Sequence, residues 1–82
     1  MKVIFNNETK RLPNFESYSD LTFQSSVNFG FLDTMEFGEN IKFYYKDTDG
    51  DVISLTNQSD LDEAYKVMGK GNLKLVIAKN IQ

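Results

Sequence analysis

The sequence has no cysteine and no histidine among its 82 residues. These absences exclude disulfides, the usual zinc sites, thiol nucleophiles and catalysis by an imidazole base. Paired carboxylates can still act as acid and base, but they need a cleft with unequal environments, and a chain this short has little material to wall one. We therefore expect no catalytic residue, no metal site, no cofactor and no enzymatic activity.

Long apolar stretches are also missing, and neither a signal peptide nor a membrane-spanning segment is visible. The formal net charge is −3 and the isoelectric point is near 4.7, so nucleic acid is not an expected partner. Seven Phe, four Tyr and 40% apolar residues are enough for one compact core. We expect a single domain over residues 1–82, the N-terminal module of a larger cytoplasmic protein, with no membrane contact.

Charge is unevenly distributed along the chain. Six carboxylates and no Lys or Arg occur between residues 47 and 63, whereas the rest of the chain has nine basic residues against six acidic ones. The six are Asp47, Asp49, Asp51, Asp60, Asp62 and Glu63. A tight turn at residues 47–51 and a helix start capped by Ser59 explain each acid locally, but not the lack of compensating cations. Unneutralised charge of one sign in a small area favours a basic partner.

The spacing of Asp47, Asp49 and Asp51 also suggests a calcium loop, because alternate Asp residues can direct oxygens at one cation. In an EF-hand, however, the sixth position is Gly and the twelfth is a bidentate Glu. Val52 and Gln58 stand at these positions here, so the calcium interpretation is disfavoured.

Hydrophobic periodicity predicts five strands and two helices. Alternating residues predict strands at residues 1–5, 10–12, 41–46, 52–55 and 73–77, and helical spacing predicts helices from Ser17 to Gly30 and over residues 60–68. A turn at residues 6–9 joins the first two strands, so Lys2, Lys10 and Arg11 should form one basic patch. This order of elements is typical of an α+β domain with one mixed sheet and helices on one face.

The two helices should each bury an apolar stripe. The first is expected to carry Leu21, Phe23 and Val27 inward, and the second Leu61, Ala64, Tyr65 and Met68. Between residues 30 and 40, Phe31, Leu32, Met35 and Phe37 suggest a loop that is anchored on the core.

The acidic stretch resembles the OPCA motif of the Phox-and-Bem (PB-one, or PB1) protein interaction domains. The matching residues are Tyr45, Asp47, Asp49, Gly50, Asp51, Leu55, Asp60, Leu61, Glu63 and Ala64. Lys2, three residues before Phe5, and the pair Lys10-Arg11 are similar to the basic residues on the first two strands of these domains. The resemblance extends from Lys2 to Ile77 and implies a ubiquitin-like β-grasp (ββαββαβ) with parallel first and last strands at the sheet centre.

The resemblance also implies head-to-tail docking between such domains. An acidic face of Asp47, Asp49, Asp51, Asp60 and Glu63 would dock onto a basic face of Lys2, Lys10 and Arg11 on another domain. With both faces, the chain is expected to be a mixed type whose partners are other PB-one domains, including copies of itself, in signalling scaffolds.

Two other β-grasp functions stay open: a ubiquitin-like recognition module with an apolar sheet patch, and a Ras-binding type, which would need a basic main face. A conjugated modifier would end in Gly-Gly, whereas this sequence ends Ala78-Lys79-Asn80-Ile81-Gln82, so conjugation is not expected.

Overall fold

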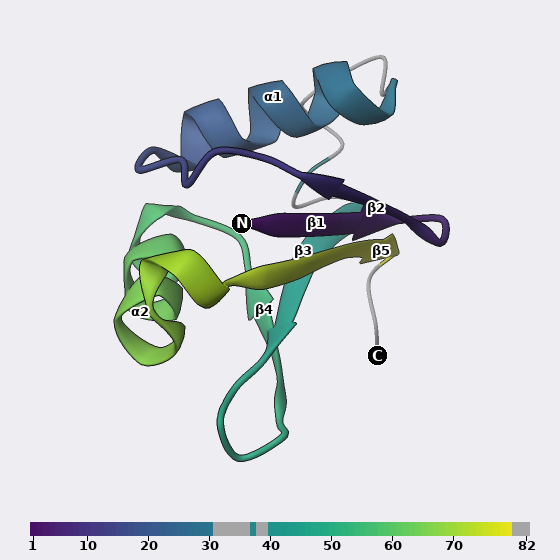
Figure 1. Ribbon diagram of the computed structural model, residues 1–82. Coiled ribbons are helices and arrows are strands. Elements are labelled where there is room, and N and C mark those ends of the chain that lie inside the picture. Colours follow the sequence, from purple (N-terminus) through teal and green to yellow (C-terminus); the bar gives the residue numbers. More distant parts are fainter. Residues whose placement is uncertain (31–36, 38–39, 80–82) are drawn as a thin grey trace.

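The computed structural model describes residues 1–30, 37 and 40–79 (Figure 1). Its elements are β1 (Lys2–Phe5), β2 (Glu8–Arg11), α1 (Tyr18–Phe29), β3 (Ile41–Lys46), β4 (Val52–Leu55), α2 (Gln58–Met68), the short 3-10 helix η2 (Lys70–Asn72) and β5 (Lys74–Lys79). The predicted order of five strands and two helices is confirmed. No helix of the described ranges is long and apolar enough to cross a membrane.

The strands form one mixed sheet in the order β2-β1-β5-β3-β4. β1 and β5 are parallel, and the other three pairs are antiparallel. This is the ubiquitin-like β-grasp that the sequence analysis expected, with the first and last strands side by side. Figure 1 shows α1 lying across one face of the sheet and α2 beside it, next to β4.

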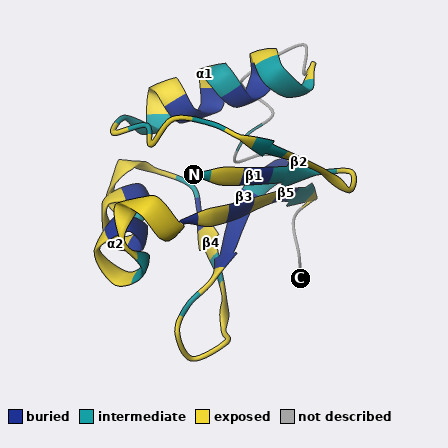
Figure 2. Cartoon of the chain, in the orientation of Figure 1, coloured by how far each residue is buried: buried dark blue, intermediate teal, exposed yellow. Residues whose placement is uncertain are grey.

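The core lies between α1 and the covered face of the sheet. Alternate residues of neighbouring strands are buried there, including Val3, Leu75 and Phe43, each with 0% exposure. The Phe43 ring meets Tyr18 of α1 edge to face at 6.2 Å between centroids and stacks on Phe37 at 4.6 Å. In Figure 2 the buried segments of both helices turn toward the sheet.

A two-residue turn joins β1 to β2. Asn6 and Asn7 have φ angles of 50° and 66°, the left-handed region that a tight hairpin of this type requires and that Asn tolerates. Phe5 therefore pairs directly with Glu8, and β2 begins two residues earlier than predicted. This turn fixes the register of the whole hairpin.

Helix α1 begins and ends as predicted but buries a different face. The Ser17 side chain accepts a hydrogen bond from the Asp20 backbone N–H, and Gly30 ends the helix at φ 77°. Of the three residues expected to point inward, only Leu21 does, since Phe23 and Val27 are 57% and 62% exposed.

Small residues explain the orientation of α1. Thr22, Ser25 and Ser26 share the buried face with Leu21, at the spacing of one helical stripe. The Ser26 hydroxyl donates to the Thr22 carbonyl at 2.9 Å, so this buried polar group is satisfied inside the helix. The buried stripe of α1 is thus made of Leu21 and small polar side chains, and the bulkier Phe23 and Val27 face outward.

Helix α2 begins at Gln58, two residues before the predicted start. Asn57 is its N-cap, and the Asn57 Oδ1 accepts a hydrogen bond from the Asp60 N–H at 2.9 Å. The expected cap, Ser59, lies inside the first turn instead. The predicted stripe is confirmed by the burial of Leu61, Ala64 and Tyr65, with Met68 partly buried.

The segment between α1 and β3 is described only in part. Of its four expected anchors, Phe37 is partly buried and packs against the core. Phe31, Leu32 and Met35 lie outside the described residues.

Candidate protein interaction surfaces

The loop between β3 and β4 is held by one of its own carboxylates. Asp47 Oδ1 accepts hydrogen bonds from the backbone N–H groups of Asp49 and Asp51, both at 2.9 Å. The Asp47 N–H donates to the Asp51 carbonyl and the Gly50 N–H to the Asp47 carbonyl, each at 3.0 Å. Gly50 has a φ of 85°, which a residue with a side chain rarely adopts. The loop is thus an ordered turn that presents Asp49 and Asp51 to solvent.

The second acidic group, at the start of α2, also has one carboxylate that holds the backbone and others that face solvent. Asp60 Oδ2 accepts hydrogen bonds from the Thr56 N–H at 2.9 Å and the Thr56 hydroxyl at 3.2 Å, so this carboxylate anchors the connection from β4 to α2. Glu63, one turn later, is exposed. Asp62 is also exposed and accepts a hydrogen bond from Gln58 Nε2 at 3.0 Å.

The two acidic groups converge around Tyr45. Burial, and then the carboxylates of Glu63, Asp47 and Asp60, raise the pKa of the Tyr45 hydroxyl. This side chain is therefore within the electrostatic reach of both the loop and the helix. Asp49 and Asp51 lie beside Asp47 in the same loop, and together Asp47, Asp49, Asp51, Asp60 and Glu63 are here called the acidic corner.

No cation neutralises the acidic corner within the described part of the chain. The single ion pair among the described residues joins Lys70 Nζ to Glu16 Oε1 at 2.8 Å, and it lies outside the acidic corner. One oxygen from each of Asp47, Asp49 and Asp51 lies within 4.8 Å of the others. Exposed acidic clusters of this kind are common without a metal ion, and their mutual repulsion is also relieved by a basic partner.

The basic residues lie at the other side of the sheet. Lys2 of β1 pairs with Arg11 of β2 and, on its other side, with Lys74 of β5. Side chains of directly paired residues lie on the same face, so Arg11, Lys2 and Lys74 form one row across three strands, here called the basic row. All three are exposed.

Lys10 does not belong to this row. It pairs with Val3, which is fully buried on the covered face. Its Nζ lies 5.5 Å from the centre of the Phe29 ring of α1, a cation–π contact. The expectation that Lys2, Lys10 and Arg11 share one patch is therefore wrong for Lys10, because neighbouring residues of a strand point to opposite faces.

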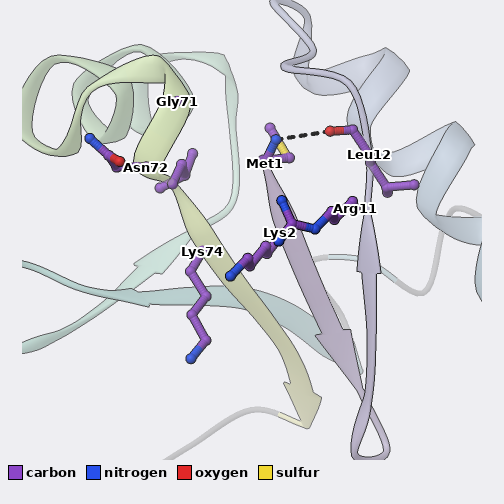
Figure 3. A pocket seen from close by; sticks show the side chains of 8 residues that line it. Met1, Lys2, Arg11, Leu12, Gly71, Asn72 and Lys74 are labelled. Atoms are coloured by element: carbon purple, nitrogen blue, oxygen red, sulfur yellow. Dashed lines mark hydrogen bonds between the residues drawn. The ribbon is translucent and has the colours of Figure 1, made fainter.

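The basic row borders a hollow of about 350 Å³ (Figure 3). Lys2, Arg11 and Lys74 line it together with Met1, Leu12 and the turn at Gly71 and Asn72. The Met1 amino group donates to the Leu12 carbonyl at 2.8 Å, which ties the start of β1 to the end of β2. The hollow is therefore a concave surface bordered by cations.

The acidic corner and the basic row are separate surfaces. The corner is built on β3, β4 and α2, whereas the row runs over β2, β1 and β5, and β2 and β4 are the opposite edges of the sheet. Figure 1 shows the β3–β4 loop projecting away from the β1–β2 hairpin. A single copy therefore presents both charges without neutralising either.

Sequence reasoning missed Lys74. Its alternation with Leu73 and Leu75 was visible, but only the parallel pairing of β5 with β1 places it beside Lys2.

Comparisons with known proteins agree with this architecture. Residues 1–80 match the family described as PB1 domain. A solved structure titled "AtNBR1-PB1 domain" is similar with a TM-score of 0.71 at 18% sequence identity, covering 96% of this chain and 93% of that one. No curated protein matches the chain. Because the family match spans nearly the whole sequence, the chain belongs to the PB1 domain family of protein–protein interaction modules.

Proposed function

We propose that this domain docks head-to-tail, with the acidic corner of one domain seated on the basic row of another PB1 domain. The observation that carries the proposal is the separation of unneutralised acidic and basic surfaces onto opposite parts of one sheet. The acidic corner acts as an OPCA-type face and Lys2 is the central cation of the basic face. The domain is then a mixed type that serves as an assembly module in a scaffold.

The acidic residues contribute in two ways. Asp47 and Asp60 each accept two hydrogen bonds inside the domain and hold the loop and the helix start in place. Asp49, Asp51 and Glu63 are exposed and are the principal contacts to the partner's cations. Ordered backbone beneath exposed carboxylates lowers the entropy lost on docking.

Affinity must come from several ion pairs acting together. One exposed pair contributes only about 0–1 kcal/mol, whereas three cations in a fixed row can meet several carboxylates at once. Opposite potentials also accelerate encounter and orient the partners. Docking should therefore weaken as salt is raised, because the interacting groups are exposed.

A domain with both faces can bind copies of itself. Such a contact is heterologous, so a free face is left at each end and further copies can add. We expect short chains or filaments at low salt.

Sedimentation velocity at low and high salt tests this proposal. The wild type should form oligomers at low salt, Lys2→Ala and Asp49→Ala should each be monomeric, and an equimolar mixture of these two variants should form heterodimers through the undamaged faces. Lys10→Ala and Asp20→Asn are matched controls that remove charge outside both surfaces, so they should assemble like the wild type.

The equimolar mixture of Lys2→Ala and Asp49→Ala is the decisive test of head-to-tail docking. If Lys2→Ala and Asp49→Ala fold but do not combine with each other, head-to-tail docking between copies is wrong. If Lys10→Ala disrupts assembly as strongly as Lys2→Ala, the basic row is not the docking surface.

A further inference from the structure

The face of the sheet opposite α1, here called the open face, carries charge of one sign. Strand pairing shows which side chains point to it, namely those that alternate with the buried core residues. The charged residues at these positions are Lys2, Arg11, Lys42, Lys46 and Lys74, and no Asp or Glu occupies an outward position of any of the five strands.

The middle of the open face is apolar. Ile4, Val76 and Tyr44 pair across β1, β5 and β3 and form a continuous stripe. Beside this stripe is a second hollow of about 530 Å³, lined by Tyr44, Tyr45, Val52, Met68, Val76 and Ala78, with Lys46, Lys74 and Asn72 also contributing.

The residues that line this hollow differ in their exposure to solvent. Of its lining residues, Val52 and Val76 are 54% and 38% exposed, whereas Tyr44 is only 7% exposed. Its volume lies in the range of pockets that hold ligands, about 300–1,000 Å³. The hollow is therefore large enough to receive a bulky apolar side chain from outside.

This hollow shares Lys74 with the basic row and Tyr45 with the acidic corner, but it is a different surface from either. Neither Lys2 nor Arg11 lines it, and it extends from Lys74 toward Val52 on the far edge strand. Its lining includes the apolar side chains of Val52, Met68 and Val76, whereas the acidic corner is an array of carboxylates. A ligand for the hollow must offer an apolar group as well as negative charge.

We propose that this hollow is a second docking site, which binds an acidic peptide segment of a partner protein through a large apolar side chain flanked by carboxylates. The apolar side chain packs against Val76 and Tyr44. The flanking carboxylates pair with Lys46 and Lys74, neither of which is in an ion pair within the described residues. The chemistry of the occupant follows from complementarity, because Val52, Met68, Val76 and Ala78 give the lining an apolar part and its two charged residues, Lys46 and Lys74, are both basic.

An anionic membrane is a poorer fit to the same surface. Insertion between lipids requires apolar side chains that project beyond the cations, whereas here Tyr44 is only 7% exposed. A peptide can reach into a hollow that a flat bilayer cannot.

The test is an NMR titration of the Asp49→Ala variant, which cannot assemble through its acidic corner. The probe is a short synthetic peptide of Asp and Glu with adjacent Phe and Leu at its centre. Saturable amide shifts are expected at Val76, Ala78 and Tyr44. Two control peptides, one with Ser in place of Phe and Leu and one with Lys in place of the acids, should bind much more weakly.

Variants locate the site. Val76→Asp should weaken binding about tenfold or more, because it removes an apolar contact and adds repulsion. Val76→Thr keeps the side-chain shape and a folded strand, so it separates loss of the apolar surface from loss of the fold. Lys46→Glu should also weaken the peptide, whereas Lys2→Ala should not.

Each alternative outcome is distinct. The proposal is overturned if no saturable shift occurs, if the Ser peptide binds equally well, or if the shifts centre on Lys2 and Arg11 and disappear in Lys2→Ala. It is also overturned if phosphatidylserine vesicles bind and the peptide does not. Because Val76→Asp should still assemble head-to-tail in an otherwise wild-type chain, failure of one docking mode is separable from failure of the other.

Discussion

Asp47 should have two separable roles, one as a hydrogen-bond acceptor and one as a charge. Its Oδ1 holds the N–H groups of Asp49 and Asp51, and its negative charge adds to the acidic corner. Asp47→Asn keeps an acceptor oxygen in the same place, and Asn is well suited to this kind of turn. Asp47→Ala removes both the acceptor and the charge. Comparing the two variants therefore isolates the contribution of the turn.

The magnitude follows from the two hydrogen bonds. A hydrogen bond contributes about 0.5–1.5 kcal/mol net, and these two lie on an exposed loop, so Asp47→Ala should lower the free energy of unfolding by about 1–2 kcal/mol. For a domain of this size about 1 kcal/mol corresponds to a fall in Tm of about 4–8 °C. Asp47→Asn should stay within about 0.5 kcal/mol of the wild type.

Thermal and urea unfolding measure the stability difference, and sedimentation measures docking. Both substitutions should weaken assembly, but Asp47→Ala more strongly, because its loop no longer orders Asp49 and Asp51. Asp49→Ala is the matched control, since it removes one carboxylate from the same loop without removing the acceptor. Equal stability of Asp47→Asn and Asp47→Ala would refute the role of the Asp47 side chain in the turn.

Two further predictions concern α2. Asn57→Ala should lower the free energy of unfolding, measured in urea, by about 1 kcal/mol because it removes the side-chain cap on the Asp60 N–H. Ser59→Ala should lower it much less. The reverse order would show that Ser59 is the cap. Burial, and then the Glu16 carboxylate, raise the pKa of Tyr65 to about 12, and its hydroxyl donates to the Phe15 carbonyl. The folded state thus holds this proton more tightly than the unfolded state, so the stabilisation is complete below about pH 10 and is lost as pH rises toward about 12. Spectrophotometric titration should show one tyrosinate appearing last, and Tyr65→Phe should remove it and flatten the loss of stability; no change in that late titration would contradict the prediction.

The strands were predictable because their alternation is local. Val3, Phe43 and Leu75 each stand at the centre of a short apolar-polar alternation, and each is fully buried. The orientation of α1 was harder, because its inward face carries Ser25 and Ser26 while Phe23 looks like a core residue in the sequence. Hydrophobicity alone cannot show that the smaller polar side chains, and not Phe23, are the buried ones.

The acidic corner was predictable in composition, and the basic surface only in part. The acids lie within one short stretch, so their convergence around Tyr45 needs only a turn and a helix start. The choice between Lys10 and Arg11 depends on the hairpin register that the Asn6-Asn7 turn sets. Lys74 required knowledge of a parallel pairing between distant strands, which periodicity does not contain.

The parallel pairing of β1 with β5 also sets the order in which the acidic corner and the basic row can form. The acidic corner is formed by one continuous stretch, whereas the basic row unites residues 2 and 11 with residue 74. Contacts between residues so distant in sequence form only after a large loop has closed. During synthesis on the ribosome, Lys2 can gain its neighbour Lys74 only after β5 has emerged, so a nascent chain completes its basic row last.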